Sequence, residues 1–350
     1  MTEVINSLGE FLQNADADYW VFDIGRRLQA LDHEQFAAIE QQRQAYPYPL
    51  QRHAWLAVCF WHRQRPQQPY LWFLKLPLDE RGLLNSAARN QFLLQVMEAL
   101  GAQVTAEISE AQQQQLQQNP FLFTPSEDKR AALHAQLQVR RQQPPSIHFE
   151  AVQQYFAAQA NNSDSAQAQR WQDIGLQGLH DVAARLMQDA NLTAQLSACY
   201  TQLPLAVLRP LTVALENTQP PPALRDALLR YFTQLNAGER RSLCLRALAG
   251  CAEQPMVSQC LRQPLAAAHD ANYELDELIV IAARLWPLLG DAEALQQYLL
   301  LLSQQPHSTF TALFAELISL PALRPQLLAL LQQTNLPDAL QQALQRMRSS

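Results

Sequence analysis

The stretch HAWLAVCFWHRQRPQQPYLWFLKLPLDERG, residues 53–82, decides the first part of the fold. Two runs within it, 53–62 and 70–76, are rich in aromatic and β-branched residues, which favour extended strands. The polar segment RQRPQQP between them has the length of a hairpin connection. The sequence therefore predicts an antiparallel β-hairpin, and such a hairpin needs a covering layer to be stable.

Patterns on either side of the hairpin supply that layer and extend the sheet. Aromatic and β-branched residues at 19–24 predict another strand. Asp32 has the position of an N-cap, which predicts a helix over 33–44. Apolar residues at helical spacing predict a second helix over 84–100, and a further short strand is possible at 102–108.

The character of the chain changes near Thr124, and this change sets the predicted domain boundaries. We interpret residues 1–123 as a small α+β domain, with an antiparallel sheet and helices. Residues 124–170 are predicted to be a helical connector that starts with Thr124 as N-cap and contains a flexible segment at 161–168. Residues 171–350 contain one helical run after another, which predicts an all-α domain.

The helical runs of the later domain recur with a rough period. Two runs together span about 30 to 36 residues, the size of a two-helix repeat. No unit carries a recognised consensus, so we predict a degenerate array of the HEAT or armadillo kind. Gly is scarce, with 9 residues, and Pro is common, with 21, which fits many short helices better than a glycine-rich α/β fold. The chain is therefore expected to be predominantly α.

Three N-terminal motifs carry a family resemblance: YWVFDIGRR at 19–27, HAWLAVCFW at 53–61 and WFLKLPLDERG at 72–82. They resemble motifs of a family of uncharacterised bacterial proteins, known only as a domain of unknown function, which runs close to the whole length of the chain. The resemblance implies a cytoplasmic bacterial protein. It implies no activity and therefore assigns no catalytic residues.

Composition and spacing narrow the possible partners. The net charge is −6 and neither half of the chain is basic, which disfavours nucleic acid as a partner. Neither a signal-peptide pattern nor 18 consecutive apolar residues occur, so we expect a cytoplasmic protein that does not insert into a membrane. Histidine and cysteine spacings that hold metals are missing from the sequence, so neither a metal nor another cofactor is predicted.

Five charged residues form the first candidate site, provided that the strand at 19–24 lies next to the second hairpin strand. Arg26 would offer a bidentate fork and Lys75 a point charge to an anion or partner. The alternative is a structural salt-bridge network that pins the sheet to its turn, and this is the commoner origin of such clusters. The residues of this candidate patch are Asp23, Arg26, Arg27, Lys75 and Asp79.

Aromatic residues form the second candidate site. Trp55, Trp61 and Trp72 could make an exposed docking face, as aromatic residues do at protein interfaces. The alternative is that these residues form the core between sheet and helices. A sheet that is aromatic on both faces could also pair with a second copy, so a homodimer is possible. His180, beside Asp181, is expected to be a surface histidine.

The leading functional hypothesis is a non-enzymatic protein–protein interaction or scaffold protein that uses a helical-repeat surface. The sequence has no phosphate loop, dinucleotide fingerprint or nucleophile elbow, so no catalytic residue is assigned. One alternative is an enzyme or small-anion-binding protein with a site around Asp23, Arg26 and Lys75. The second alternative is a helical-repeat nucleic-acid binder.

Overall fold

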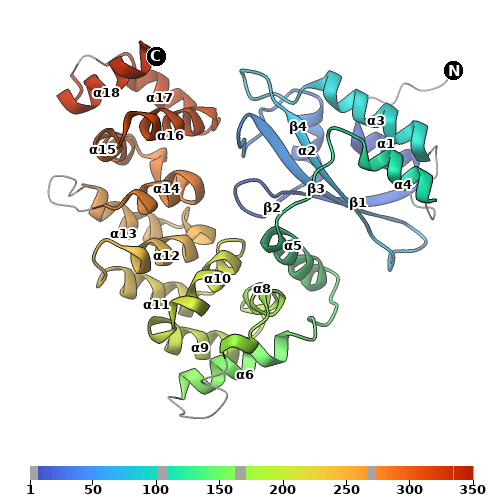
Figure 1. The fold of residues 1–350 in the computed structure, drawn as a ribbon, viewed down its shortest axis with the longest axis horizontal. Helices are drawn as coiled ribbons and strands as arrows, with labels where there is room; N and C mark the ends of the chain where they lie inside the picture. The colour runs from blue at the N-terminus through green and yellow to red at the C-terminus, as the bar shows by residue number, and fades with distance from the viewer. Residues whose placement is uncertain (1–6, 101–108, 162–170, 267–272, 334, 350) are drawn as a thin grey trace. The chain divides into compact units, whose positions relative to one another are not determined.

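Two compact units make up the chain in the computed structural model (Figure 1), which describes residues 7–100, 109–161, 171–266, 273–333 and 335–349. The first unit is Met1–Pro125 with Ile318–Arg324, and the second is Ser126–Leu317 with Pro325–Ser350. The possible strand at 102–108 and residues 162–168 of the predicted flexible segment lie outside the described residues. A small antiparallel sheet followed by many helices confirms the predicted fold class, which is predominantly α.

The first unit contains a four-stranded antiparallel sheet with the strand order β2-β1-β3-β4. The strands are β1 (Ala17–Asp23), β2 (Gln29–Leu31), β3 (His53–His62) and β4 (Tyr70–Pro77). Strands β3 and β4 form the predicted hairpin, in which Trp55 lies opposite Lys75. Strand β2 was not predicted, because three residues are too few to show an alternating pattern.

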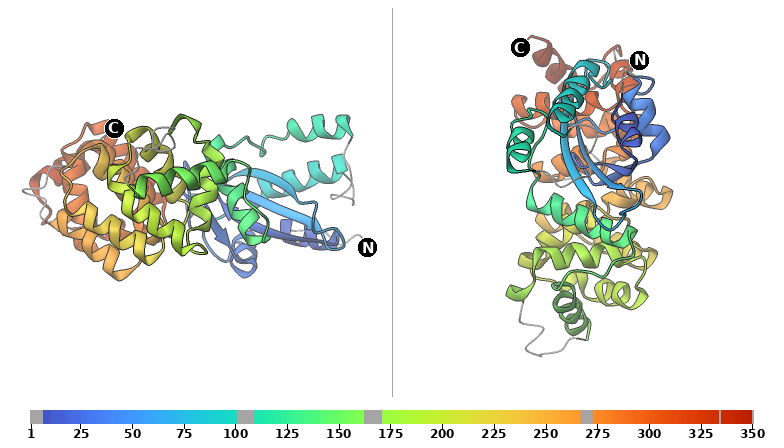
Figure 2. Two further views of the ribbon diagram at one scale, coloured as in Figure 1. Left: turned by 90° about the horizontal axis from the view of Figure 1, so that it is seen from below. Right: turned by 90° about the vertical axis from the view of Figure 1, so that its right-hand side faces the viewer.

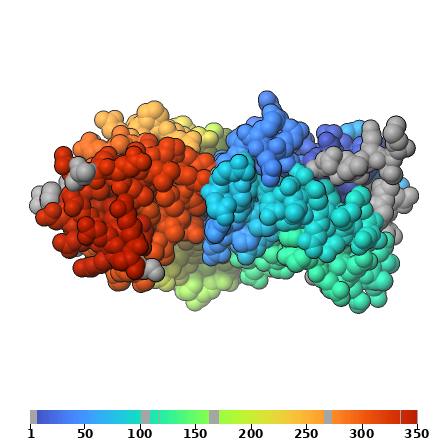
Figure 3. Space-filling view, turned by 90° about the horizontal axis from the view of Figure 1, so that it is seen from above, coloured from blue at the N-terminus to red at the C-terminus, as the bar shows by residue number. Residues whose placement is uncertain are grey.

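Helices cover one face of this sheet. They are α1 (Leu8–Asn14), α2 (His33–Glu40) and α3 (Ser86–Leu100), and α4 (Glu110–Gln117) packs on α3. The hydrophobic core lies between the two layers, where Val58 and Leu74 from the strands meet Phe36 and Phe92 from the helices. Helix α2 begins as predicted, because the Asp32 side chain accepts a hydrogen bond from the Gln35 amide at 2.7 Å. The surface of α3 and α4 appears from cyan to green in Figure 3.

The second unit consists of helices that follow one another closely. They are α5 (Glu127–Arg140), α6 (Phe149–Ala160), α8 (Leu176–Arg185), α9 (Ala190–Cys199), α10 (Leu205–Leu215), α11 (Pro222–Phe232), α12 (Glu239–Ala247), α13 (Pro255–Ala266), α14 (Leu275–Arg284), α15 (Ala292–Ser303), α16 (His307–Ser319), α17 (Arg324–Leu330) and α18 (Asp338–Arg348). Short 3₁₀ turns lie at Trp171–Asp173, Tyr200–Gln202, Ala249–Cys251 and Trp286–Gly290.

These helices pack in two rows. In the first row α5 contacts α8, which contacts α10, which contacts α12, which contacts α14. In the second row α6 contacts α9 and α9 contacts α11, and further along α13 contacts α15 and α15 contacts α18. From α5 to α15 the chain alternates between the rows, so that each two-helix unit adds one helix to each row (Figures 1 and 2). Buried leucines such as Leu208, Leu211 and Leu228 fill the space inside the array.

One local prediction for the helices needs correction. Thr124 is not the N-cap of α5; the helix begins at Glu127, and Ser126 accepts a hydrogen bond from the Lys129 amide at 3.4 Å. This start places two carboxylates in the first turn, where the helix dipole favours negative charge. Two prolines lie inside helices, Pro210 in α10 and Pro264 in α13. Each of them removes one backbone hydrogen-bond donor from its helix.

Candidate functional site

Three residues of the predicted charged patch are held inside the first unit. Asp23 is fully buried and accepts a hydrogen bond from the Tyr46 hydroxyl at 2.5 Å. Burial, together with the Asp23 carboxylate, raises the pKa of Tyr46 well above its ordinary value, so the hydroxyl remains a donor. Arg26 is 1% exposed, and its Nε donates to the Pro49 carbonyl at 2.8 Å. Arg27 donates to Gln29 at 2.7 Å.

The condition for the predicted patch is not met, because β3 lies between β1 and β4, and the other two residues, Lys75 and Asp79, make separate contacts. The Lys75 Nζ stands 4.5 Å from the centroid of the Trp55 ring, a cation–π contact across β3 and β4. In the described part of the chain, Lys75 makes no ion pair. Asp79 instead closes the turn after β4, where it accepts from the Arg81 and Leu83 amides at 2.9 and 2.8 Å. A slight loss of hydration raises the pKa of Asp79, but these hydrogen bonds outweigh it and the pKa lies below its ordinary value.

The three tryptophans of the predicted docking face do not share one face. Trp72 points into the core, is 8% exposed and meets the Phe92 ring edge-on at 5.6 Å. Trp55 and Trp61 lie on the other face of the sheet, where Trp61 packs against Trp20 with ring centroids 4.6 Å apart. The cause is register: Trp72 pairs with the inward-facing Val58 of β3, whereas Trp55 pairs with Lys75 on the other face of the sheet. Trp72 is therefore a core residue.

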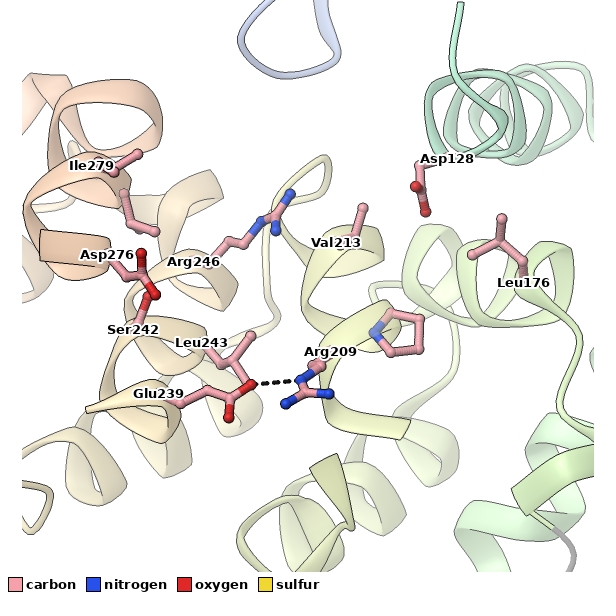
Figure 4. A pocket seen from close by; sticks show the side chains of 12 residues that line it. Asp128, Leu176, Arg209, Val213, Glu239, Ser242, Leu243, Arg246, Asp276 and Ile279 are labelled. Carbon is pink, nitrogen blue, oxygen red and sulfur yellow. Dashed lines mark hydrogen bonds and ion pairs between the residues drawn. The ribbon is translucent and has the colours of Figure 1, made fainter. Parts of the chain in front are cut away.

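A site that sequence reasoning missed lies in the second unit. A depression with a volume of about 580 Å³ opens on the row formed by α5, α8, α10, α12 and α14 (Figure 4). All five helices contribute to its lining, and its size is within the range of ligand pockets. The apolar lining is Leu176, Pro210, Val213, Leu243, Ile279 and Val280. The polar lining is Asp128, Arg209, Glu239, Ser242, Arg246 and Asp276. We call this depression the row groove.

Helical periodicity places these side chains on the groove side of their helices. In α12 they come from positions 239, 242, 243 and 246, and in α14 from 276, 279 and 280. Residues three, four and seven apart lie on one helix face, so each helix presents a stripe that mixes apolar and charged groups. Such a stripe looks like an ordinary solvated face when one helix is read alone. Only the stacking of five helices turns the stripes into one concave surface.

A buried carboxylate joins three helices of the row that carries the groove. Glu216, the residue that ends α10, is 1% exposed and is bonded to Arg246 of α12. It also accepts a hydrogen bond from the Nε of Arg284 in α14 at 3.0 Å. Burial alone raises the pKa of Glu216, but the charges of Arg284 and Arg246 outweigh it and hold the pKa below its ordinary value. Glu216 is therefore ionised and ties α10 to both later helices of the row.

Further ion pairs join neighbouring helices of the same row. Arg209 of α10 and Glu239 of α12 meet at 2.5 Å on the groove surface, and this hydrogen bond lowers the pKa of Glu239. Arg241 of α12 and the fully buried Glu277 of α14 form a bidentate pair with distances of 2.5 and 2.8 Å. The guanidinium of Arg241 also lies over the ring of Tyr273, 4.7 Å from its centroid. The two pairs fix α12 against its neighbours on either side.

His180 corrects another sequence expectation. It is 2% exposed rather than a surface residue, and its Nε2 lies 3.7 Å from the Oδ1 of Asp128. Burial lowers the pKa of His180, and this effect outweighs the opposite influence of Asp128 and Asp181. The imidazole is therefore uncharged at neutral pH, and His180 supplies no positive charge to Asp128.

The fold defines the class: a predominantly α protein with a small antiparallel sheet unit and a helix array. The chain belongs to the family described as "Protein of unknown function (DUF3549)", whose model matches residues 3–348. No curated protein and no solved structure matches the chain. None of the helices in the described residues has the length and apolar character needed to cross a membrane. Among those residues, no group of three or more His, Cys, Asp and Glu is placed to hold a metal ion.

Proposed function

We propose that this protein is a non-enzymatic interaction or scaffold protein of the bacterial cytoplasm, which binds partner proteins on the surface of its helix array. The observation that carries the proposal is the row groove, a concave surface to which five successive helices contribute. Stacked helix pairs of the HEAT or armadillo kind bury a continuous seam and leave such a surface free for partners. The alternation of the chain between two rows supports that comparison.

The composition of the row groove also supports protein binding. Ile279 is 39% exposed although it is a large apolar residue, and Val213 and Leu176 beside the groove are half-buried. Apolar surface with a charged border is typical of protein interaction sites. The groove therefore combines a surface that gains from desolvation with charges that can select a partner.

The buried ion pairs support the same proposal, because they hold the groove in one shape. Glu216 links α10, α12 and α14, and the pair of Arg241 with Glu277 links α12 and α14 a second time. A surface that is rigid before binding loses less conformational freedom when the partner arrives. These pairs join the same helices that line the groove, which fits a docking platform.

Affinity capture from the native cell tests the proposal. In a variant that combines Val213→Asp and Ile279→Asp, we expect the recovery of proteins that co-purify with the wild type to fall at least tenfold. The reason is that these changes place charge in the apolar lining. Met187→Asp is the matched control, since Met187 is 63% exposed and does not line the groove. Circular dichroism checks that both variants remain folded. Equal recovery of every co-purifying protein with the groove variant would contradict the proposal.

A further inference from the structure

We propose that the occupant of the row groove is a basic, apolar segment of the partner protein: a few apolar side chains flanked on both sides by Lys or Arg. This inference rests on the proposed function and names the chemistry of the partner. Three features of the groove carry it, namely its apolar middle, the internal pairing of its arginines, and two carboxylates that face solvent without a cation.

The middle of the groove calls for apolar side chains. Val213 of α10 lies between Leu176 of α8 and Leu243 of α12 (Figure 4). Pro210 of α10 also lines the groove, and Ile279 of α14 extends the apolar surface. Burying these side chains under a partner is favourable, because it removes apolar surface from water. A partner with small polar side chains at this place would gain nothing from that surface.

The arginines of the groove are already neutralised by the protein itself. Arg209 is paired with Glu239 at 2.5 Å, and Arg246 is paired with the buried Glu216. Arg284 shares Glu216, and the low pKa of that carboxyl keeps its negative charge in place. An acidic or phosphorylated partner would have to compete with these carboxylates for the same guanidinium groups.

Two acidic residues have no such partner. Asp276, in the first turn of α14, is exposed and forms no ion pair within the described residues. The side chain of Asp128 in α5 is 42% exposed, and within the described residues its one ion-pair contact is with His180, which is uncharged at neutral pH. In Figure 4 Asp128 lies beside Leu176 on one side of the groove and Asp276 lies on the other side with Ile279. The groove therefore carries, on each side of its apolar middle, a carboxylate that no cationic side chain pairs with in the described residues.

This charge pattern is complementary to a segment with cations at both ends. Opposite charges at the edge of an interface speed up the encounter and fix its register, whereas like charges disfavour a partner. The surface also continues past Leu176 into a second depression of about 440 Å³ on α5 and α8, which Glu127 and Arg130 border. An extended surface of this kind fits a stretch of polypeptide rather than a single small molecule.

Selection of displayed peptides on the full-length protein tests the inference. The library holds apolar residues at the central positions and randomises the flanks. We expect Lys and Arg to be enriched on both sides. Synthetic versions of the selected peptides should then bind about fivefold more weakly to Asp128→Asn and to Asp276→Asn, as measured by fluorescence anisotropy, and more weakly at high salt. Glu253→Gln is the control, because Glu253 is an exposed acid that does not line the groove.

The outcomes separate this inference from the proposed function. One outcome is that the selected peptides have acidic or uncharged flanks and lose binding to the variant with Val213→Asp and Ile279→Asp. This outcome would overturn the inference that the partner segment is basic, and it would leave the groove as a protein-binding surface. Failure to select any peptide whose binding depends on the groove would overturn the inference, and the capture experiment would then decide the function by itself. If Asp128→Asn or Asp276→Asn does not fold, the peptide is changed instead. Replacement of its Lys residues by Gln should weaken its binding to the wild-type protein in the same way.

Discussion

The two units hold buried carboxylates in different ways, as Glu40 and Glu216 show. In the sheet unit Glu40 accepts hydrogen bonds from the amides of Leu8 and Gly9 at 2.6 and 3.0 Å, so its partners are the backbone at the start of α1. In the helix array Glu216 is held by two arginine side chains from later helices. The first arrangement fixes the start of α1 to the end of α2. The second fixes the spacing of helices that repeat along a row.

The two carboxyls consequently have opposite pKa shifts. Burial raises the pKa of Glu40, and the amides of Gly9 and Leu8 offset this only in part. Burial also acts on Glu216, but there the charges of Arg284 and Arg246 prevail and the pKa falls. Full positive charges compensate a buried carboxylate more completely than amide dipoles do. The comparison teaches that the array depends on ionised pairs, whereas the sheet unit tolerates an acid that resists ionisation.

The largest loss of stability is expected for Glu216→Ala, which removes the carboxylate held by two arginines. The variant leaves Arg246 and Arg284 facing each other without a counter-charge, and breaking a buried ion pair in this way costs about 3 to 5 kcal/mol. Urea denaturation followed by far-ultraviolet circular dichroism, which mainly reports the helix array, should show a lower midpoint. Glu253→Ala, at an exposed position, should leave the midpoint unchanged.

Tryptophan fluorescence provides the second signal for that experiment. Of the six tryptophans, the sheet unit holds Trp20, Trp55, Trp61 and Trp72. We expect the fluorescence midpoint of Glu216→Ala to change much less than the dichroism midpoint. Equal shifts in both signals would mean that the two units unfold together. Glu216 would then stabilise both units and not the helix array alone.

Arg26→Ala is the next largest effect and tests the sheet unit. Arg26 is 1% exposed and donates to the Pro49 carbonyl, so truncation leaves a cavity and an unsatisfied acceptor. We expect a loss of about 2 to 3 kcal/mol, read as a lower fluorescence midpoint in urea. Arg65→Ala, in the exposed connection between β3 and β4, is the control. Unchanged or raised stability would instead favour a residue that is kept for binding or catalysis.

Lys75→Ala should have a smaller effect than Arg26→Ala. Its ammonium contacts the Trp55 ring at 4.5 Å, and a half-exposed cation–π contact is worth about 0.5 to 1 kcal/mol. The same urea titration measures the loss, and Lys75→Arg should restore most of it because a guanidinium also stacks on Trp. A destabilisation as large as that of Arg26→Ala would show that Lys75 has a structural role beyond this contact.

The smallest effects concern pH and have opposite signs for the two carboxyls. The folded pKa of Glu216 is lowered, so its stabilisation is present above the ordinary value of 4.5 and is lost as the pH falls through the folded pKa. The difference in stability between Glu216→Gln and the wild type should therefore become smaller only below pH 4.5. The folded pKa of Glu40 is raised, so its ionisation costs stability above 4.5, and Glu40→Gln should gain relative to wild type between pH 4.5 and 7.

Urea midpoints at a series of pH values, one set for each variant, measure these differences. The wild type measured in parallel is the reference at every pH, so the titration of all other groups cancels. The same sign for both variants would break the comparison between backbone and arginine partners.

Local signals explain what the sequence could predict. The bounds of β3, the Asp32 cap and the alternation along β4 all depend on residues close together in the chain. The alternation places Trp72 and Lys75 on opposite faces of β4. It does not show which residues of β3 share a face of the sheet with Trp72. That choice depends on the pairing of Trp72 with Val58, which is a contact between strands.

The row groove and its supporting pairs had no local signal at all. Arg246 lies 30 residues after Glu216, and Arg241 lies 36 residues before Glu277. Each of these residues looks like a solvated charge at its own position in the sequence, because nothing nearby shows that it is buried. Only the stacking of helices far apart in the chain brings the partners together, so single-sequence reasoning could predict the array but not the site on it.

The reach of Glu216 has a mechanical consequence. In an array where each helix touches only its immediate neighbours, pulling on one end peels the helices away in small steps. Glu216 grips Arg284, which belongs to the second helix along the row and lies 68 residues away. Under force, residues 205–284 should therefore unfold in a single long extension, because the bonds of Glu216 join α10, α12 and α14.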